Sequence, residues 1–327
     1  MRYENYGISV GSPSYVLTGN IPRFQYQKSD VLMVTGASDD QAFASFNCLY
    51  SMVLADPYAS YLYIDFGLTD KERNILFAHF ESIRQVQLKM KSNGFIAYRK
   101  FKWNSFPKWM WTEKNIGKVI AHMDAAFAWK GITMWNDGGN LIREGISREI
   151  TNARVDGVYS PPSEGNQKRW THPDTANFLI QHHLIDHFSY DDPNCSTGLI
   201  VSDWSHSDVV ERVLYPYYQC AFTQKCVSPR NSNKDNHRQD QSVLSALLNN
   251  IKPRRSMNWD FDYHPAFHWE FGNDEEKCKK ISGNLLRSIQ DTYQIRIDNT
   301  YIPRSIMKYT RLDGPYVSRV IDREWKP

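Results

Sequence analysis

The segment Val31-Leu32-Met33-Val34-Thr35 runs directly into Gly36-Ala37-Ser38-Asp39-Asp40. An apolar, β-branched run followed by a small and polar stretch predicts a buried strand and its loop. Residues 42–55 then carry apolar side chains at helical spacing, and Asp56-Pro57 ends that pattern. Because Tyr61-Leu62-Tyr63-Ile64-Asp65 predicts a second strand, the whole region is expected to form a βαβ unit.

The same alternation continues through residue 140. Thr69 followed by Glu72 is the pattern of a capping box and predicts the start of another helix. A third strand is expected at 95–98, a helix at 116–129 and a short buried strand at 132–135. This order predicts an α/β fold class with a Rossmann-like mixed central sheet flanked by helices.

After residue 140 the regular alternation of strands and helices is less clear in the sequence. Residues 161–166 are interpreted as a mobile loop, 174–188 as an amphipathic helix and 196–201 as a return to the sheet. Further helices are expected at 207–220, 241–249 and 276–292. The expected organisation is a leader at 1–29, a single α/β domain at 30–270, and a C-terminal helix with a polar tail at 271–327.

Composition excludes several classes of protein. A chain of 327 residues with 41% hydrophobic content can bury one large core, so it is not a disordered chain. Its formal charge of +3 gives no case for nucleic acid, and the basic patch at 252–255 is interpreted as a solvated turn. No apolar run is long enough to span a membrane and no signal peptide is apparent, so a cytoplasmic protein is expected.

The cysteines give no motif. Their five positions are irregularly spaced and form no Cys-x-x-Cys pair. Buried free thiols are the favoured interpretation, and a link between Cys220 and Cys226 is the alternative.

Two short stretches point to chemistry. Trp135-Asn136-Asp137-Gly138-Gly139-Asn140 and His237-Arg238-Gln239-Asp240-Gln241-Ser242 each place a carboxylate among amides and small residues beside an apolar segment. Polar groups of this kind are what an open α/β sheet presents to a ligand. We therefore expect the two stretches to form two walls of one site.

Together these elements resemble the GT-A fold glycosyltransferases that use nucleotide sugars, in particular family 8 and family-8-like proteins of nematodes and large viruses. The resemblance covers roughly residues 30–250 by the order of elements. It implies a uridine-binding strand and loop, a metal motif that follows Trp129-Lys130, and a donor-sugar motif at Asp240-Gln241.

The metal motif departs from the family pattern. The family uses Asp-x-Asp, because a divalent cation that bridges two phosphates needs carboxylate oxygens. Asp137 matches the first aspartate, whereas Gly139 stands in place of the second. A late histidine completes the family's ligand set, and His264 or His268 is the candidate here, with His268 preferred. The cofactor implied is Mn²⁺ or Mg²⁺.

The resemblance also implies roles for the remaining candidates. Asp240 and Gln241 would act on the donor sugar, with Asp137 at the leaving diphosphate. The residues expected to bind the donor nucleotide sugar are Thr35, Ala37, Ser38, Asp65, Arg99, Lys130, Ser196, Thr197 and Gly198. Inert alternatives exist for several of them, since Asp137 can be a turn residue, Asp240 a helix cap, and Arg99 and Lys130 surface ion-pair partners.

An acceptor wall is expected at Trp170 and His172, because tryptophan stacks on the apolar face of a sugar; a buried aromatic beneath a loop is the alternative. His183 and His187 lie four apart on an expected helix, which leaves a zinc hydrolase as a minor rival. A carbohydrate-binding protein without activity is the other rival. The main hypothesis is transfer of galactose, glucose, xylose or a related sugar from a UDP-sugar to a glycan hydroxyl.

Overall fold

The computed structural model describes residues 15–17, 30–112, 114–143, 145–251, 265–268 and 273–297. Most of the expected leader, the basic patch at 252–255, His264 and the final residues of the tail lie outside these ranges. The chain divides into two compact units. Unit 1 comprises Met1–Ser105, Asn136–Gly145 and Ala266–Pro327, and unit 2 comprises Phe106–Trp135 and Ile146–Pro265.

The sheet of unit 1 is mostly parallel. Its strands follow the order β1-β4-β3-β2, in which β2, β3 and β4 are parallel and β1 is antiparallel to β4. Strands buried on both faces are expected to be apolar throughout, as the central residues of β2 and β3 are. The bounds are β1 (Tyr15–Leu17), β2 (Val31–Ser38), β3 (Ser60–Gly67) and β4 (Ile96–Lys100). The predicted βαβ unit is confirmed.

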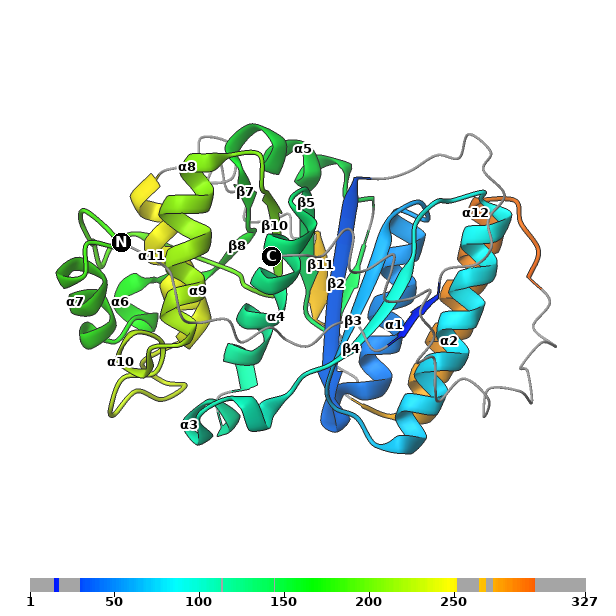
Figure 1. Cartoon of the computed structure of the whole chain (residues 1–327), viewed down its shortest axis with the longest axis horizontal. Coiled ribbons are helices and arrows are strands. Elements are labelled where there is room, and N and C mark those ends of the chain that lie inside the picture. Colours follow the sequence, from blue (N-terminus) through cyan, green and yellow to red (C-terminus); the bar gives the residue numbers. More distant parts are fainter. Residues whose placement is uncertain are drawn as a thin grey trace. The chain divides into compact units, whose positions relative to one another are not determined.

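Three long helices belong to unit 1: α1 (Ala42–Ala55), α2 (Asp70–Lys89) and α12 (Glu275–Thr292). Figure 1 shows them grouped beside β2, β3 and β4. Helix α1 is buried along most of its length because α12 packs against it, with a hydrogen bond from Ser282 to Asn47 inside the contact. The capping box formed by Thr69 and Glu72 at the start of α2 is also confirmed. Short 3₁₀ turns occur at η1 (Asp39–Gln41) and η2 (Trp103–Ser105).

Unit 2 contains the strands β5, β10 and β7 in that order, with β10 antiparallel to β7, and a separate antiparallel pair, β8 and β9. The strand bounds are β5 (Ile132–Asn136), β7 (Val158–Tyr159), β8 (Pro162–Asn166), β9 (Pro193–Cys195) and β10 (Leu199–Asp203). The helices are α3 (Lys108–Thr112), α4 (Lys114–Trp129), α5 (Ser147–Asp156), α6 (Gln167–Trp170), α7 (Pro173–Gln181), α8 (Ser207–Val209), α9 (Tyr215–Ala221), α10 (Gln224–Val227) and α11 (Gln239–Ile251). The expected mixed α/β class is confirmed.

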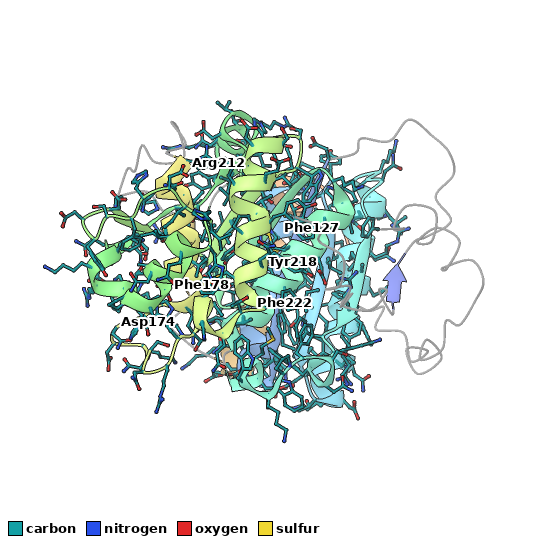
Figure 2. The ribbon with its side chains drawn as sticks, turned by 60° about the vertical axis from the view of Figure 1, so that its left-hand side comes forward. Phe127, Asp174, Phe178, Arg212, Tyr218 and Phe222 are labelled. Carbon is teal, nitrogen blue, oxygen red and sulfur yellow. A yellow bond between two sulfur atoms is a disulfide. The ribbon has the colours of Figure 1, made fainter. Side chains whose placement is uncertain are left out.

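Aromatic rings hold α4 and α9 together. Phe127 of α4 packs edge-to-face on Tyr218 of α9 with 5.0 Å between ring centroids, and Tyr218 packs on Phe222 at 4.9 Å. Figure 2 labels these three residues; Phe127 comes from α4, Tyr218 from α9, and Phe222 directly follows α9. The hydroxyl of Tyr218 donates to Asp124 at 2.6 Å, so the polar end of this buried ring is satisfied.

Several boundaries predicted for unit 2 are wrong. The expected mobile loop at 161–166 contains strand β8, because β9 offers it a pairing partner from a distant part of the sequence. The expected helix at 174–188 ends at Gln181. The strand expected at 196–201 begins only at Leu199, and the helix expected at 207–220 contains a π-helical turn at Val210–Leu214. Local patterns carry no information about pairing between distant segments, which decided the first of these differences.

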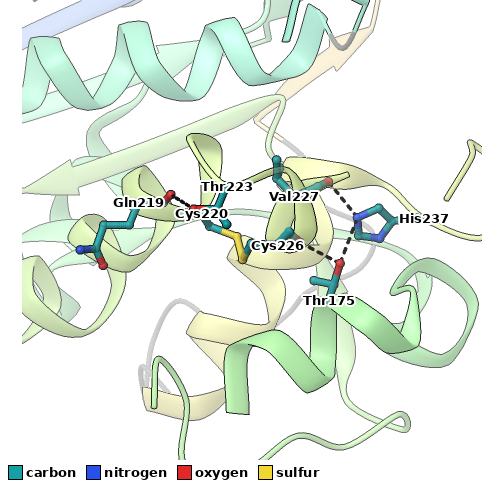
Figure 3. Close-up of a disulfide and its surroundings, with 7 residues drawn as sticks. All are labelled: Thr175, Gln219, Cys220, Thr223, Cys226, Val227 and His237. Atoms are coloured by element: carbon teal, nitrogen blue, oxygen red, sulfur yellow. Dashed lines mark hydrogen bonds between the residues drawn. A yellow bond between two sulfur atoms is a disulfide. The ribbon is translucent and has the colours of Figure 1, made fainter. Parts of the chain in front are cut away.

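Cys220 and Cys226 form a disulfide, so the favoured interpretation of free thiols is wrong for this pair and the alternative is correct. Cys48, Cys195 and Cys278 are free and buried, as expected. The disulfide anchors α10, where Val227 accepts a hydrogen bond from His237 at 3.0 Å (Figure 3). The pKa of His237 is lowered to about 4, chiefly by burial, so its ring is neutral at pH 7.

Removing the disulfide should destabilise the protein moderately. The two cysteines are six positions apart, and closing a loop of that size in the unfolded chain is worth about 2 kcal/mol. We expect the variant Cys220→Ser with Cys226→Ser to lose that amount of unfolding free energy in urea titrations. Dithiothreitol should lower the stability of the wild type and leave the variant unchanged; equal responses of both proteins would contradict the prediction.

Candidate functional site

Residues Asn136–Asn140 of unit 1, here called the Asp137 turn, are tied to the end of β2 through Cys48. The Asn136 side-chain amide donates to the Cys48 sulfur at 3.2 Å, and the Thr35 hydroxyl lies 3.4 Å from the same sulfur. Burial raises the pKa of Cys48 to about 12, and the negative charge of Asp137 adds to this shift. Asp137 therefore lies within electrostatic reach of a neutral, buried thiol.

Gly138 lets the Asp137 turn approach β2 closely. A Cβ atom built on Gly138 would lie 2.7 Å from the carbonyl oxygen of Gly36 and 2.9 Å from the Cβ of Ser45. It would also lie 3.5 Å from the Cβ of Ala37. A Cβ contact below 3 Å with backbone forces the turn or the strand to shift, so this close approach depends on glycine. The turn is thus packed on the strand end where Thr35, Ala37 and Ser38 were expected to bind the nucleotide.

His268 enters the same region through its backbone. Strand β6 (Asn140–Ile142) pairs antiparallel with β11 (Ala266–His268), and His268 stands opposite Asn140 in the register. The backbone N–H of Asn140 also closes the turn on the Asp137 carbonyl at 2.9 Å. The backbone of His268 thereby lies beside Asn140, at the end of the Asp137 turn.

The donor set near Asp137 is small for a metal site. No group of three His, Cys, Asp or Glu side chains that could hold an ion occurs among the described residues. A cation that prefers oxygen would find one carboxylate in the turn, and Gly139 adds no side chain. The residues fit such an ion only if diphosphate oxygens complete its coordination.

Asp65 has a full set of partners at the end of β3. Its carboxylate accepts from the backbone N–H groups of Gly67 at 2.8 Å and Leu68 at 2.6 Å, from Arg73 at 3.0 Å, and from the Tyr98 hydroxyl. The side chain is fully buried. These hydrogen bonds satisfy the buried carboxylate, and they give Asp65 a structural role: it holds the turn after β3 in place.

The other predicted nucleotide and phosphate contacts differ in setting. Ser38 is partly exposed and donates to Asp40, and Arg99 is buried in β4 of unit 1. Lys130 belongs to unit 2, where it is exposed directly after α4 with a left-handed backbone, φ 53°. Their contacts with a donor remain predictions.

In unit 2, Lys118 joins two of the predicted donor-sugar segments. Its Nζ lies 3.1 Å from a carboxylate oxygen of Asp240 and 3.3 Å from the Thr197 hydroxyl. Asp240 is 2% exposed and Thr197 3%. Two segments more than forty positions apart in sequence therefore meet at one buried ion pair. We call Lys118, Thr197 and Asp240 the Asp240 cluster.

Neutral groups surround the Asp240 cluster. Burial raises the pKa of Cys195 to about 11, and the charge of Asp240 contributes. Burial and the positive charge of Lys118 lower the pKa of His122, one helical turn along α4, to about 3. The thiol and the imidazole are both uncharged at pH 7, so Lys118 supplies the countercharge of Asp240.

Two side-chain amides beside this cluster have an unused hydrogen-bond donor. Gln241 Nε2 and Asn194 Nδ2 are buried and, within the described part of the chain, have no hydrogen-bond partner. Ser245 connects these residues, since its hydroxyl lies 2.7 Å from the Gln241 carbonyl and 2.8 Å from Asn194 Oδ1. A buried N–H group without a partner costs about 1–3 kcal/mol, so the arrangement favours a ligand with oxygen acceptors.

Ser196 and Gly198 lie in the turn before β10, not within a strand. The Ser196 hydroxyl accepts from the Gly198 backbone at 3.2 Å, and the Ser196 backbone N–H donates to Pro161 at 2.7 Å. The turn presents Thr197 to Lys118. Asp240 is not the helix cap that the inert alternative supposed. Helix α11 begins at Gln239, so Asp240 lies inside its first turn.

The predicted acceptor residues are less open than expected. Trp170 is 7% exposed, its indole N–H donates to the Glu164 carbonyl at 2.9 Å, and two arginine side chains lie over its ring. His172 is the N-cap of α7 and accepts from the Asp174 backbone at 3.2 Å. The Trp170 ring offers a sugar no open stacking face, and only 16% of the His172 side chain is exposed.

The zinc hypothesis loses its geometric basis. Because α7 ends at Gln181, His183 and His187 do not share a helical face, and His183 has a left-handed backbone with φ 55°. The ring of His187 bonds the amide of Asn250 at 2.9 Å.

Sequence reasoning missed Lys118 and Asn194. Lys118 looks like a solvated residue of an amphipathic helix, and Asn194 precedes the expected strand by only two positions. The one available signal was a lysine among the apolar residues Ile116, Val119 and Ile120.

Comparison with solved structures finds glycosyltransferases. The structure is similar to the galactosyltransferase LgtC in complex with donor and acceptor sugar analogues, at 11% identity and a TM-score of 0.46 over 77% of this chain and 95% of that one. It is similar to the mannosyltransferase Ktr4p from S. cerevisiae, at 9% identity and a TM-score of 0.46 over 88% of both chains. A third is core-mannan synthase A from Aspergillus fumigatus in a Mn/GDP form, at 8% identity and a TM-score of 0.45 over 77% of this chain and 78% of that one.

No protein-family model matches the sequence, and no curated protein matches it. At the identities and TM-scores given above, the structural likenesses do not identify an activity for this chain.

Replacing Gly138 tests the close approach of the Asp137 turn. Gly138→Ala should reduce the unfolding free energy by about 1–3 kcal/mol, because the added methyl group meets backbone and must displace the turn. Gly283→Ala is the matched control, since a Cβ atom placed there has nothing within 4 Å and alanine favours the helix α12. Equal stability of the two variants in urea titrations would exclude a tight contact at Gly138.

Replacing Lys118 tests the buried ion pair. Lys118→Met should cost about 3–5 kcal/mol of unfolding free energy at pH 7, because it leaves the Asp240 carboxylate buried without its countercharge. Lys71→Met is the control, since Lys71 pairs with Glu275 at the surface, where a pair contributes about 1 kcal/mol or less. Adding Asp240→Leu should recover most of the loss; a double variant whose loss equals the sum of the two single losses would argue against coupling.

Proposed function

We propose that this protein is a glycosyltransferase that moves a sugar from a nucleotide sugar, in the first instance a UDP-sugar, to a hydroxyl of a glycan or glycoconjugate. The observation that carries the proposal is the contact of Lys118 with both Asp240 and Thr197. It joins the two segments that the family 8 resemblance assigns to the donor sugar. Gln241 and Asn194 add buried amide donors beside them.

The Asp240 cluster has the chemistry that a hexose or pentose requires. An ionised carboxylate accepts hydrogen bonds from sugar hydroxyls, and amide N–H groups donate to the hydroxyl oxygens. Lys118 keeps Asp240 charged and limits its rotation, so less has to be reordered when substrate binds. A carboxylate and an amide oxygen near the reacting carbon also stabilise positive charge that develops during transfer.

The Asp137 turn has the features required at the nucleotide end of the donor. Gly138 packs the turn against the end of β2, so a nucleotide held at Asp137 would lie beside Ala37 and Ser38. Thr35 is fully buried, and its hydroxyl already contacts Cys48. Asp137, with His268 on the neighbouring strand, would hold a divalent cation together with diphosphate oxygens. Such a cation supplies positive charge that stabilises the departing nucleoside diphosphate.

A protein that binds carbohydrate without catalysis is the alternative, because Gly139 removes the second carboxylate of the family's metal motif. The two functions differ in turnover. An active transferase slowly hydrolyses its donor when no acceptor is present, because water can take the place of the acceptor hydroxyl. A binding protein with no catalytic site releases no nucleoside diphosphate.

The disulfide is relevant to the cellular compartment in which the protein works. No helix in the described ranges is both long and apolar enough for a membrane span. A disulfide such as Cys220–Cys226 is typical of proteins from oxidising compartments, whereas the sequence suggested the cytoplasm. An oxidising compartment that contains glycan acceptors agrees better with this bond.

A panel of nucleotides and nucleotide sugars, with and without Mn²⁺, tests the proposal through thermal stabilisation. A ligand at a hundred times its dissociation constant adds about 2.7 kcal/mol to the stability of the native state. We expect UDP or one UDP-sugar to raise the melting temperature, and Asp137→Asn to remove any increment that Mn²⁺ adds. Release of UDP from that donor should fall at least about a hundredfold in Asp240→Asn. This variant loses the negative charge that would stabilise positive charge on the sugar in the transition state.

Asp208→Asn is the control for both measurements, because this aspartate is exposed on the short helix α8. It should match the wild type. Stabilisation by no nucleotide would contradict the proposal, and stabilisation without UDP release would favour the binding protein.

A further inference from the structure

Two arginines cover Trp170 in unit 2. The guanidinium carbon of Arg238 lies 3.7 Å from the centroid of the Trp170 ring, and that of Arg169 lies 4.4 Å from it. A cation over an indole ring is attracted to the negative face of the ring. We call these three residues the Trp170 cation cluster.

The charges of the Trp170 cation cluster are unbalanced. Arg169 pairs with Glu164 at 2.9 Å, and the Asp240 carboxylate is paired with Lys118. Arg238 has only one polar side-chain contact in the described part of the chain, with the Ser163 hydroxyl at 3.4 Å. No described carboxylate lies within ion-pair distance of Arg238, so most of its N–H donors have no acceptor among the residues that the structure describes.

The environment of Arg238 favours an added negative charge. Burial lowers the pKa of its guanidinium from the ordinary value, Glu164 opposes this shift, and Arg169 adds to it. Partial burial and a second cation both destabilise the charged state of Arg238. An anion bound beside it would offset both effects.

The backbone holds Arg238 next to the proposed sugar site. Its N–H donates to the Trp170 carbonyl at 3.0 Å and lies 3.1 Å from the Ser242 hydroxyl. The next residue, Gln239, has φ 43°, a left-handed conformation that is costly for a residue with a side chain. Such strain persists where the surroundings impose it, and it occurs often at functional sites. It lies here between Arg238 and Asp240.

We propose that Arg238, supported by Arg169 and Trp170, binds a carboxylate or phosphate group carried by the acceptor sugar. Arginine presents a planar fork of N–H donors that matches the oxygens of either group, which lysine does not. The acceptor is therefore an acidic or phosphorylated glycan, and a neutral glycan lacks the group that Arg238 recognises. This inference rests on the proposed function, which it deepens by naming the acceptor class.

Three small sugars test the inference by calorimetric titration of the full chain. Methyl β-D-glucuronide carries a carboxylate, glucose 6-phosphate carries a phosphate, and methyl β-D-glucoside is neutral. We expect at least one charged sugar to bind about tenfold or more tightly than the neutral one, as charge-assisted hydrogen bonds provide. The preferred charged sugar identifies the anionic group, and its advantage should shrink as the salt concentration rises.

Arg238→Gln should abolish this preference, and Arg238→Lys, which keeps the charge without the fork, should retain part of it. Arg212→Gln is the matched control: Arg212 is exposed, pairs with Asp186 at 3.5 Å and lies on a different helical segment (Figure 2). The control should behave as the wild type. Equal binding of all three sugars by the wild type, or a preference that survives in Arg238→Gln, would overturn the inference.

Nucleotide stabilisation of the wild type separates this inference from the proposed function. A preference for a charged sugar that depends on Arg238, without any nucleotide binding, would support the anion site and contradict the transferase. Stabilisation by UDP with equal binding of the three sugars would overturn the anion site and leave the transferase in place.

Discussion

Burying an ionised carboxylate costs free energy unless its charge is balanced, and Lys118 balances that of Asp240. The pair constrains much of unit 2, because Lys118 comes from the first half of α4 while Asp240 comes from the first turn of α11. Thr197 reaches the same ammonium group from the turn before β10. Three distant segments are thus held in register by one cation. A ligand that uses Asp240 would meet a carboxylate whose charge state and orientation are already set.

Unit 1 depends on a steric constraint of a different kind. Gly138 has no side chain, and this absence lets the Asp137 turn contact the backbone of β2 at Gly36. Cys48 and Asn136 continue the contact through a buried thiol and an amide. Any ligand held by Asp137 would therefore be oriented by the end of β2 as well. The same turn lacks a second carboxylate at Gly139, so a bound diphosphate would have to provide a larger share of the cation's ligands.

The predicted site residues differ in the setting that the structure gives them, and the reasons are physical. The motif residues Asp137 and Asp240 were found because an acidic residue at the end of an apolar segment is a local pattern. Asp65 follows the same pattern, but its carboxylate is occupied by Arg73, Tyr98 and two backbone N–H groups. Three of these partners lie within eight positions of Asp65, but only the folded turn after β3 and the distant Tyr98 show that the carboxylate is fully occupied. Lys118 and Asn194 were missed because their partners, Asp240 and Ser245, lie far away in sequence.

Local sequence by itself determined the mixed α/β class, the βαβ unit, helix α1 with the bounds predicted for it, and the capping box at Thr69. These features follow from hydrophobic spacing and capping within a few residues. Only the tertiary structure decided that residues 162–166 form a strand, that the helix after Pro173 stops at Gln181, and that Cys220 bonds Cys226. It also decided which cation meets Asp240 and which rings lie under Arg238. Pairing, burial and charge compensation join residues that are distant in sequence, so they arise only when the chain has folded.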